Sequence, residues 1–337
     1  MPSNRPDSTS LADAALGLFW RAKVLRLFSS RRPIVLAYHA VAPGPADYFS
    51  PDAFERHVSL LKSRFHLVGP RECHRVRGRT EDIDVLLTFD DGFLNNALYV
   101  VPILKRHQVP AVFFISTRHC SGNRILWFVY TRALSRWFPE KQVTLDGATY
   151  DLSPTERVRS RRRLHEHLLS LKPHPQAMYD KIEHSLPFIE SFVPQRTLED
   201  HYAGMTWDHI REIAQDPLFE VGVHTVDHPL LTLCDDGELV RQIEANREDL
   251  EHVTGKRIRA IAYPGGDYDA RVRAKCADLG FDERYAVEVR RGTGDGRRET
   301  ADGCDIPRIG IYKPSLDVLG FKVQWGNLLR RTPLHFG

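Results

Sequence analysis

The feature of this chain that most limits its fold is a series of short apolar runs, each followed by a segment with helical periodicity. The runs span residues 33–39, 85–91, 109–116, 219–225, 259–263 and 305–312. An apolar run of this length, bounded by turn residues, is typical of a strand that is buried on both faces. Strands joined by helices at this spacing predict a parallel sheet. About six or seven such units favour a barrel over an open sheet.

The overall charge excludes one broad class of function. The chain has 337 residues, with 47 Lys and Arg against 44 Asp and Glu, and a formal net charge of +3. A charge this close to neutral argues against a general nucleic-acid binder. The dense basic cluster at residues 157–163 is interpreted as a solvated helix face.

The cysteines indicate a reducing compartment. Their number is odd, they are scattered, and none forms a CxxC pair; they are Cys73, Cys120, Cys234, Cys276 and Cys304. This pattern predicts neither a disulfide framework nor a cysteine zinc site.

The N-terminal segment, residues 1–30, is predicted to be an extension that precedes the main domain. No apolar run in the chain approaches the roughly 18 residues of a membrane span. Residues 11–28 show no secretory signal, so we expect a cytoplasmic protein. Their apolar residues have helical spacing, with Arg and Lys interleaved. Such a helix either packs on its own domain or lies on the anionic inner face of the membrane.

The strand and helix pattern is interrupted once. We expect one domain over residues 31–325, a helical insertion over about 121–205, and a tail over 326–337. The insertion is rich in Arg, His, Glu and aromatic residues. Its aromatic residues either form its own core or stack on sugars; they are Trp127, Phe128, Tyr130, Trp137 and Phe138.

Two adjacent acids, Asp90 and Asp91, stand where a buried strand is predicted to end, and Gly92 follows. An Asp-Gly pair on its own is a common turn signal. In a barrel of parallel strands, however, the carboxyl ends of the strands carry the chemistry. The pair is therefore a candidate site.

A second motif ends another predicted strand. His224 and His228 are separated by three residues and are followed by Pro229, which favours a loop over a helix. Two imidazoles that converge with one carboxylate make a metal site with open positions. The alternative is a pair of ordinary surface histidines.

Together the motifs TFDDG and HTVDH resemble those of the polysaccharide deacetylase family, the NodB-homology domain. The resemblance covers roughly residues 33–325 and matches the insertion less well. It implies a distorted (β/α)7 barrel. It also implies a hydrolase of non-peptide carbon–nitrogen bonds, which uses a metal to remove an acyl group, usually acetyl, from the nitrogen of an amino sugar.

The resemblance also implies residue roles. Asp91, His224 and His228 correspond to the metal ligands, and Asp90 corresponds to the general base. The expected cofactor is a divalent ion, zinc first, with cobalt, nickel or iron as alternatives. Thr225 and Asp227 are expected to hold the ligand loop.

The chain departs from the family pattern at two positions. The late Leu-x-His motif that supplies a general acid has no clear copy, and His335 lies in the predicted tail. His39 resembles the early histidine of the poly-N-acetylglucosamine deacetylase branch and is the candidate acid; the alternative is a histidine that caps a strand. The usual orienting arginine is replaced by Ala262. We hypothesise that Arg308 reaches Asp90 instead, the alternative being a surface salt bridge.

These residues predict a deacetylase of an N-acylated amino-sugar glycan or glycan precursor, acting in cell-surface glycan biosynthesis. The expected cytoplasmic location favours a lipid-linked or nucleotide-linked precursor, with peripheral contact at the inner membrane face. Two alternatives remain open. One is a carbohydrate-binding protein that kept the fold and lost turnover. The other is an amidohydrolase of a non-carbohydrate amide.

Overall fold

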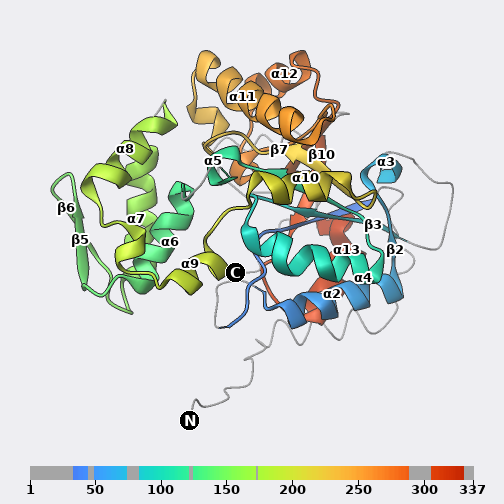
Figure 1. Ribbon diagram of the computed structural model, residues 1–337, viewed down its shortest axis with the longest axis horizontal. Coiled ribbons are helices and arrows are strands. Elements are labelled where there is room, and N and C mark those ends of the chain that lie inside the picture. Colours follow the sequence, from blue (N-terminus) through green and yellow to red (C-terminus); the bar gives the residue numbers. More distant parts are fainter. Residues whose placement is uncertain are drawn as a thin grey trace, which may run out of the picture.

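Seven parallel strands close into a barrel within the residues that the computed structural model describes, which are 33–44, 49–73, 83–120, 124–171, 174–287 and 305–329 (Figure 1). The ring closes because β1 pairs with β10 on one side and with β3 on the other. The predicted barrel is confirmed. In ring order the strands are β1 (Ile34–Tyr38), β3 (Asp84–Phe89), β4 (Ala111–Ile115), β7 (Phe219–Val223), β8 (Ala260–Ala262), β9 (Glu283–Val287) and β10 (Asp305–Gly310). A short strand, β2 (His66–Leu67), pairs with the first two residues of β3.

The barrel interior is apolar up to the carboxyl ends of its strands. Because side chains alternate along a strand, every second residue faces inward. Val35, Leu86 and Phe114 belong to one buried cluster, against which Ile306 packs. Thr88 and Arg308 lie two residues beyond Leu86 and Ile306, at the same inward parity. The periodicity of the strands therefore places one buried arginine inside the barrel.

Helices cover the outside of the barrel (Figure 1). Three of these helices are capped at their N-termini, since the side chains of Ser50, Thr206 and Asp235 accept from backbone N–H groups of the helices that follow them. Pro102 lies in the first turn of α4 (Val101–His107), directly after a π-helical segment, η2 (Asn96–Val100). The covering helices are α2 (Pro51–Arg64), α3 (Pro70–Cys73), α4 (Val101–His107), α5 (Thr117–Cys120), α10 (Trp207–Gln215), α11 (Asp236–Thr254), α12 (Ala270–Asp278) and α13 (Leu316–Leu329).

A separate lobe stands beside the barrel between α5 and α10 (Figure 1). It has its own buried cluster, which includes Trp127, Tyr130 and Leu134. We propose that it corresponds to the inserted segment over about 121–205, within a domain over 31–325. Its elements are α6 (Trp127–Trp137), β5 (Gln142–Leu145), β6 (Ala148–Asp151), α7 (Arg157–Leu169), α8 (Pro175–Ser185), η3 (Ile189–Ser191) and α9 (Gln195–His201).

The sequence predicts a helical insertion, but the lobe also contains an antiparallel hairpin formed by β5 and β6. The connecting residues Asp146 and Gly147 both have positive φ, 47° and 77°. An Asp-Gly pair with left-handed backbone is a standard two-residue hairpin turn. The Asp146-Gly147 pair, between two short alternating stretches, is a hairpin signal in the sequence. The helix-forming residues around it led to the prediction of a purely helical insertion.

Several predictions fall outside the described residues. Residues 1–30, Cys304, His335 and most of the predicted tail are among these, so the amphipathic N-terminal helix stays a prediction. The cysteines Cys120, Cys234 and Cys276 are buried and free. No helix among the described residues has the length and apolar character needed to cross a membrane.

A buried histidine on α2 ties together the strands that lead to the site. His57 Nδ1 lies 3.2 Å from the Tyr38 hydroxyl, and His57 Nε2 lies 3.0 Å from the carbonyl of Pro314. A neutral ring that donates from Nε2 and accepts at Nδ1 satisfies both contacts. Burial lowers the pKa of His57 to about 4, and the Pro314 carbonyl offsets part of this effect.

The His57 pKa predicts acid lability. The unfolded chain binds this proton near pH 6.5, whereas the folded protein binds it near pH 4, so stability is lost as the pH falls between these values. In urea titrations, the fall in unfolding free energy from pH 7.5 to pH 5 should be about 2 kcal/mol smaller in His57→Gln than in the unsubstituted protein. Equal falls in the two proteins would contradict a neutral His57.

Candidate functional site

The two adjacent acids form a tight turn at the end of β3. The Asp90 N–H donates to the Tyr38 carbonyl at 3.0 Å, which continues the barrel ladder one residue past the strand. Asp91 and Gly92 then both take positive φ, 76° and 79°. A non-glycine residue in this region is strained and is held there by its surroundings. The turn brings both carboxylates into the barrel mouth, where both are buried.

Asp90 is held by Arg308 from inside the barrel. Arg308 Nη1 donates to Asp90 Oδ1 at 2.6 Å and Nη2 donates to Oδ2 at 2.8 Å, a two-pronged contact. Nη1 also donates to the Thr88 hydroxyl at 3.1 Å. Arg308 is fully buried, with its guanidinium 5.2 Å from the Phe114 ring centre. The hypothesised reach of Arg308 to Asp90 is therefore present, and the surface salt bridge is not.

The environment keeps Asp90 ionised. Burial opposes ionisation, but the charge and hydrogen bonds of Arg308 outweigh it, so the pKa of Asp90 lies below its usual value. Both of its oxygens take guanidinium hydrogen bonds. Asp90 is thus a fixed, charged carboxylate one residue away from Asp91.

Asp91 meets two imidazoles at the same mouth. His224 Nε2 and His228 Nε2 lie 3.4 and 3.3 Å from Asp91 Oδ1. One ligand atom from each of the three residues can be chosen so that all lie within 4.8 Å of one another. Burial opposes ionisation of Asp91, but the two histidines outweigh it and hold its pKa well below the usual value.

The donor set fits a divalent cation. Both Asp91 oxygens are buried and lack a hydrogen-bond partner among the described residues, which is costly for a carboxylate unless a cation satisfies it. His224 Nδ1 lies 2.8 Å from the Ala262 carbonyl. Donation to that carbonyl places the proton on Nδ1 and leaves the Nε2 lone pair facing Asp91. Two imidazoles and one carboxylate suit Zn²⁺ and also Fe²⁺, Co²⁺ or Ni²⁺.

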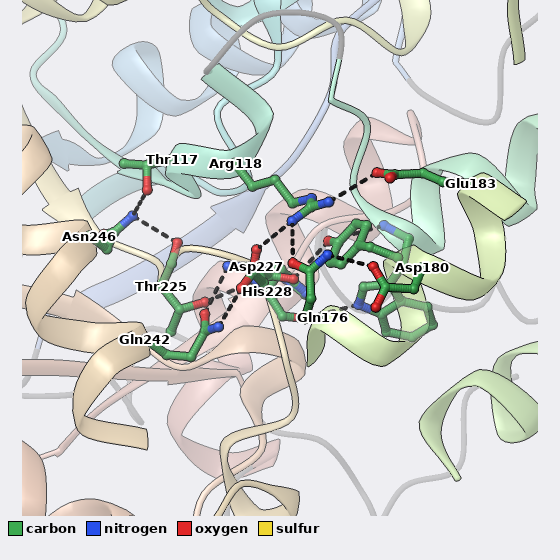
Figure 2. A network of polar contacts seen from close by, with 12 residues as sticks. Thr117, Arg118, Gln176, Asp180, Glu183, Thr225, Asp227, His228, Gln242 and Asn246 are labelled. Carbon is green, nitrogen blue, oxygen red and sulfur yellow. Dashed lines mark hydrogen bonds and ion pairs between the residues drawn. The ribbon is translucent and has the colours of Figure 1, made fainter. Parts of the chain in front are cut away.

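The loop that carries both histidines is fixed by α11 and α5 (Figure 2). Thr225 and His228 have positive φ, 66° and 52°. Asn246 Nδ2 donates to the Thr225 carbonyl at 2.7 Å. Gln242 donates to Asp227 Oδ2 at 2.5 Å and accepts from the Asp227 N–H at 2.8 Å. The expected holding roles of Thr225 and Asp227 stay predictions, and the partners that surround them are now defined.

Side chains of the inserted lobe also donate hydrogen bonds to this loop, and these contacts were not predicted from the sequence. Trp127 Nε1 donates to the His228 carbonyl at 3.0 Å, and the Tyr179 hydroxyl donates to the Asp227 carbonyl at 2.9 Å. Arg118 of α5, which is buried, donates to Asp227 Oδ1 at 3.2 Å (Figure 2). Its guanidinium lies 3.5 Å from the ring centre of Tyr179 in the lobe. These partners are 48 to 109 residues apart in the chain. No local pattern could have indicated them.

His39 lies at the same mouth, directly after β1. It is partly exposed, and its ring centre is 5.8 Å from that of Tyr312, which follows β10. Its charge, when present, lowers the pKa of both Asp90 and Asp91, behind larger effects of burial, Arg308 and the other histidines. Tyr312 is 64% exposed and was not singled out from the sequence.

Backbone N–H groups that follow Ala262 form hydrogen bonds within the fold. The N–H of Tyr263 donates to the Tyr285 carbonyl at 3.0 Å, and the N–H of Gly266 donates to the Tyr263 carbonyl at 2.9 Å. Pro264 has no N–H. The N–H groups of Tyr263 and Gly266 are therefore not available to a substrate oxyanion, and between them Gly265 has a φ of 62°.

Replacement of Asn246 by Ala should loosen the ligand loop. Asn246 is fully buried; its amide donates to the carbonyls of Ile115 and Thr225 and accepts from the His224 N–H. Loss of these partners should lower the unfolding free energy by about 3 kcal/mol. Zn²⁺ affinity, measured by competition with a chelator, should fall at least about tenfold. Asn246→Asp keeps the acceptor and loses the donors, so unchanged stability in both variants would contradict this role.

The chain matches the model of a known protein family. The family is described as "Polysaccharide deacetylase", and the match covers residues 77–283. No curated protein matches the chain.

Solved structures share the fold. IcaB from Ammonifex degensii is 18% identical, with a TM-score of 0.54 over 88% of this chain and 97% of that one. A polysaccharide deacetylase from Bacillus cereus is 15% identical, with a TM-score of 0.53 over 87% and 69%. The deacetylase PplD of Streptococcus pyogenes, in complex with acetate, is 16% identical, with a TM-score of 0.50 over 83% and 92%. At these identities the likeness concerns the fold.

Proposed function

Because this chain belongs to the polysaccharide deacetylase family, whose enzymes hydrolyse non-peptide carbon–nitrogen bonds, we propose that it is a metal-dependent hydrolase of an N-acyl amino sugar. The acyl group is most simply acetyl, and the sugar is part of a glycan or a glycan precursor. The observation that carries the proposal is the convergence of Asp91, His224 and His228 beside the fixed carboxylate of Asp90.

Asp91, His224 and His228 would hold the ion, most simply Zn²⁺. A bound ion of this kind polarises the amide carbonyl and lowers the pKa of a water ligand to about 7. The left-handed backbone of Asp91 and His228 fixes the directions of two of these ligands before any ion binds. Three protein ligands would leave positions on the ion open for water and substrate.

Asp90 is assigned as the general base. It is ionised and lies next to Asp91, so it can take a proton from the attacking water. Arg308 donates one hydrogen bond to each carboxylate oxygen and thereby fixes the orientation of the group. We include Arg308 as a positioning residue for Asp90.

His39 is assigned as the general acid that protonates the leaving amine. It ends β1, next to the strand that carries the two acids, and it is partly exposed to the barrel mouth. Its charge is felt at both Asp90 and Asp91. These observations favour His39 over a histidine that merely caps a strand. His335 lies outside the described residues.

We further propose that the enzyme works in the cytoplasm on a lipid-linked or nucleotide-linked precursor, with peripheral contact at the inner membrane face. The support is the sequence pattern of residues 11–28. Fractionation of cells at low salt tests it, because a protein recovered wholly in the supernatant has no such contact.

The function is tested by metal content and acetate release. The purified protein, loaded with Zn²⁺, should hold about one ion per chain and release acetate from N-acetylglucosamine oligomers. His224→Ala should lose both properties. Metal binding without release from oligomers or nucleotide-linked N-acetylglucosamine would favour the carbohydrate-binding alternative or a non-carbohydrate amide. Failure to bind metal would refute the hydrolase assignment.

A further inference from the structure

A groove lined by arginines runs between α6 and α7 of the inserted lobe. It encloses about 310 Å³ and is lined by Arg132, Ser135, Arg136, Arg157, Val158 and Arg161. No acidic side chain is among these lining residues. Arg132, Arg136 and Arg161 are partly buried along the groove rather than extended into solvent. Most of the basic cluster at 157–163 is exposed, as predicted for a solvated helix face, and Arg161 is its partly buried arginine.

The groove is built by two antiparallel helices whose side chains match turn by turn. At one end, the Thr131 hydroxyl contacts His165 Nε2, and the Trp127 and His165 ring centres are 5.1 Å apart. Further along, Arg132 and Arg161 line the groove, and then Arg136 and Arg157. The steps from Arg132 to Arg136 on α6 and from Arg157 through Arg161 to His165 on α7 are four residues each, which places these side chains on one side of their helix.

About one turn before the groove on α6, Phe128 packs against a residue of the candidate metal site. The ring centre of Phe128 is 4.6 Å from that of His228. Arg132 and Arg136 follow Phe128 at intervals of four residues on α6. They therefore lie about 6 Å and 12 Å further along the helix axis. A group held by these arginines would be near the site without occupying it.

The chemistry of the groove selects anions. Guanidinium groups bind phosphate and carboxylate with two parallel hydrogen bonds, which point charges such as lysine cannot do. Burial and then the positive charges of Arg161 and Arg132 lower the pKa of His165 to about 4, so this histidine adds no charge at neutral pH.

We propose that this arginine groove is a subsite for an anionic group of the substrate, a phosphate, pyrophosphate or carboxylate carried by the same glycan whose N-acyl group reaches the metal site. The inference rests on the proposed function and deepens it, because it makes the substrate an acidic or phosphate-linked amino-sugar glycan.

The test compares two double variants with the unsubstituted protein. Arg132→Gln/Arg161→Gln removes two groove arginines. Arg159→Gln/Arg162→Gln removes two exposed arginines of α7 that do not line the groove and serves as the control for net charge. Calorimetry with inorganic pyrophosphate should show an affinity loss of at least about tenfold in the groove variant and less than about twofold in the control. Thermal midpoints check that both variants fold.

Kinetics separate positioning from general damage. For an N-acetylglucosamine substrate that bears a phosphate, the groove variant should raise KM at least about tenfold, with kcat nearly unchanged. For a neutral oligomer, neither constant should move. Arg132→Lys/Arg161→Lys keeps the charge without the two-pronged geometry, and its affinity for pyrophosphate should be intermediate.

Other outcomes have distinct meanings. Equal pyrophosphate affinity in both variants, or none in the unsubstituted protein, overturns the subsite. Loss of binding to phosphatidylglycerol vesicles without loss of pyrophosphate binding also overturns it and assigns the arginines to a membrane surface. If pyrophosphate binding depends on the groove but no N-acyl sugar is hydrolysed, the anion site stands and the hydrolase assignment fails.

Discussion

Asp90→Asn is expected to lower kcat for N-deacetylation by roughly a thousandfold while leaving the metal content at the unsubstituted level. The amide that replaces the carboxylate cannot take a proton from water, so the base is lost. Asp91 and the two imidazoles are unchanged, and the new side chain still offers one oxygen to Arg308. The measurements are single-turnover acetate release and zinc content after dialysis.

The matched control for this prediction is Asp91→Asn. It is the neighbouring residue, it is equally buried, and the substitution is chemically the same. We expect Asp91→Asn to lose the metal and, with it, the activity, because the carboxylate is one of the three proposed ligands. Should Asp90→Asn also lose the metal, or Asp91→Asn keep it, the two roles would have to be exchanged.

The position of the site could be predicted because its residues follow strand ends directly. Asp90, Asp91 and His224 each come within two residues of a buried strand, and parallel strands present their carboxyl ends at one mouth. The sequence could not give the distance between them. That distance depends on left-handed backbone at Asp91 and His228, a conformation that only a few per cent of non-glycine residues adopt.

The role of Arg308 could be predicted only in part from the sequence. Its inward parity follows from the alternation along β10, but its contact with Asp90 depends on closure of the barrel between β1 and β10. Residues 218 positions apart come together through that closure.

The hydrogen bonds from the inserted lobe to the histidine loop could not be predicted from the sequence. Trp127 has the pattern of an ordinary core residue of a helix, and it is buried in the lobe. Its indole N–H reaches the His228 carbonyl, an acceptor that no side-chain pattern reveals. The same holds for the arginine groove, because only the antiparallel packing of α6 on α7 brings its two halves together.

The second large effect concerns the ion pair beneath the site. Arg308→Met is expected to lower the unfolding free energy by about 4 kcal/mol, because it leaves the buried carboxylate of Asp90 without its partner. Arg259→Met is the control. Arg259 pairs with Asp282 at 2.9 Å, but both side chains are more than half exposed, so its loss should cost less than about 1 kcal/mol. Urea unfolding at neutral pH, without metal, measures both.

A double substitution distinguishes the pair from simple loss of packing. Once Asp90 is neutral, Arg308 no longer compensates a buried charge, so Asp90→Asn/Arg308→Met should cost about 2 kcal/mol less than the sum of its two single variants. Strict additivity would mean that Arg308 acts by filling space beside Phe114 rather than by holding Asp90.

The ion pair also matters for catalysis. A base whose two oxygens are fixed by one guanidinium is oriented by the barrel itself, so a stable Arg308→Lys variant with reduced kcat and unchanged metal content would separate orientation of Asp90 from its charge.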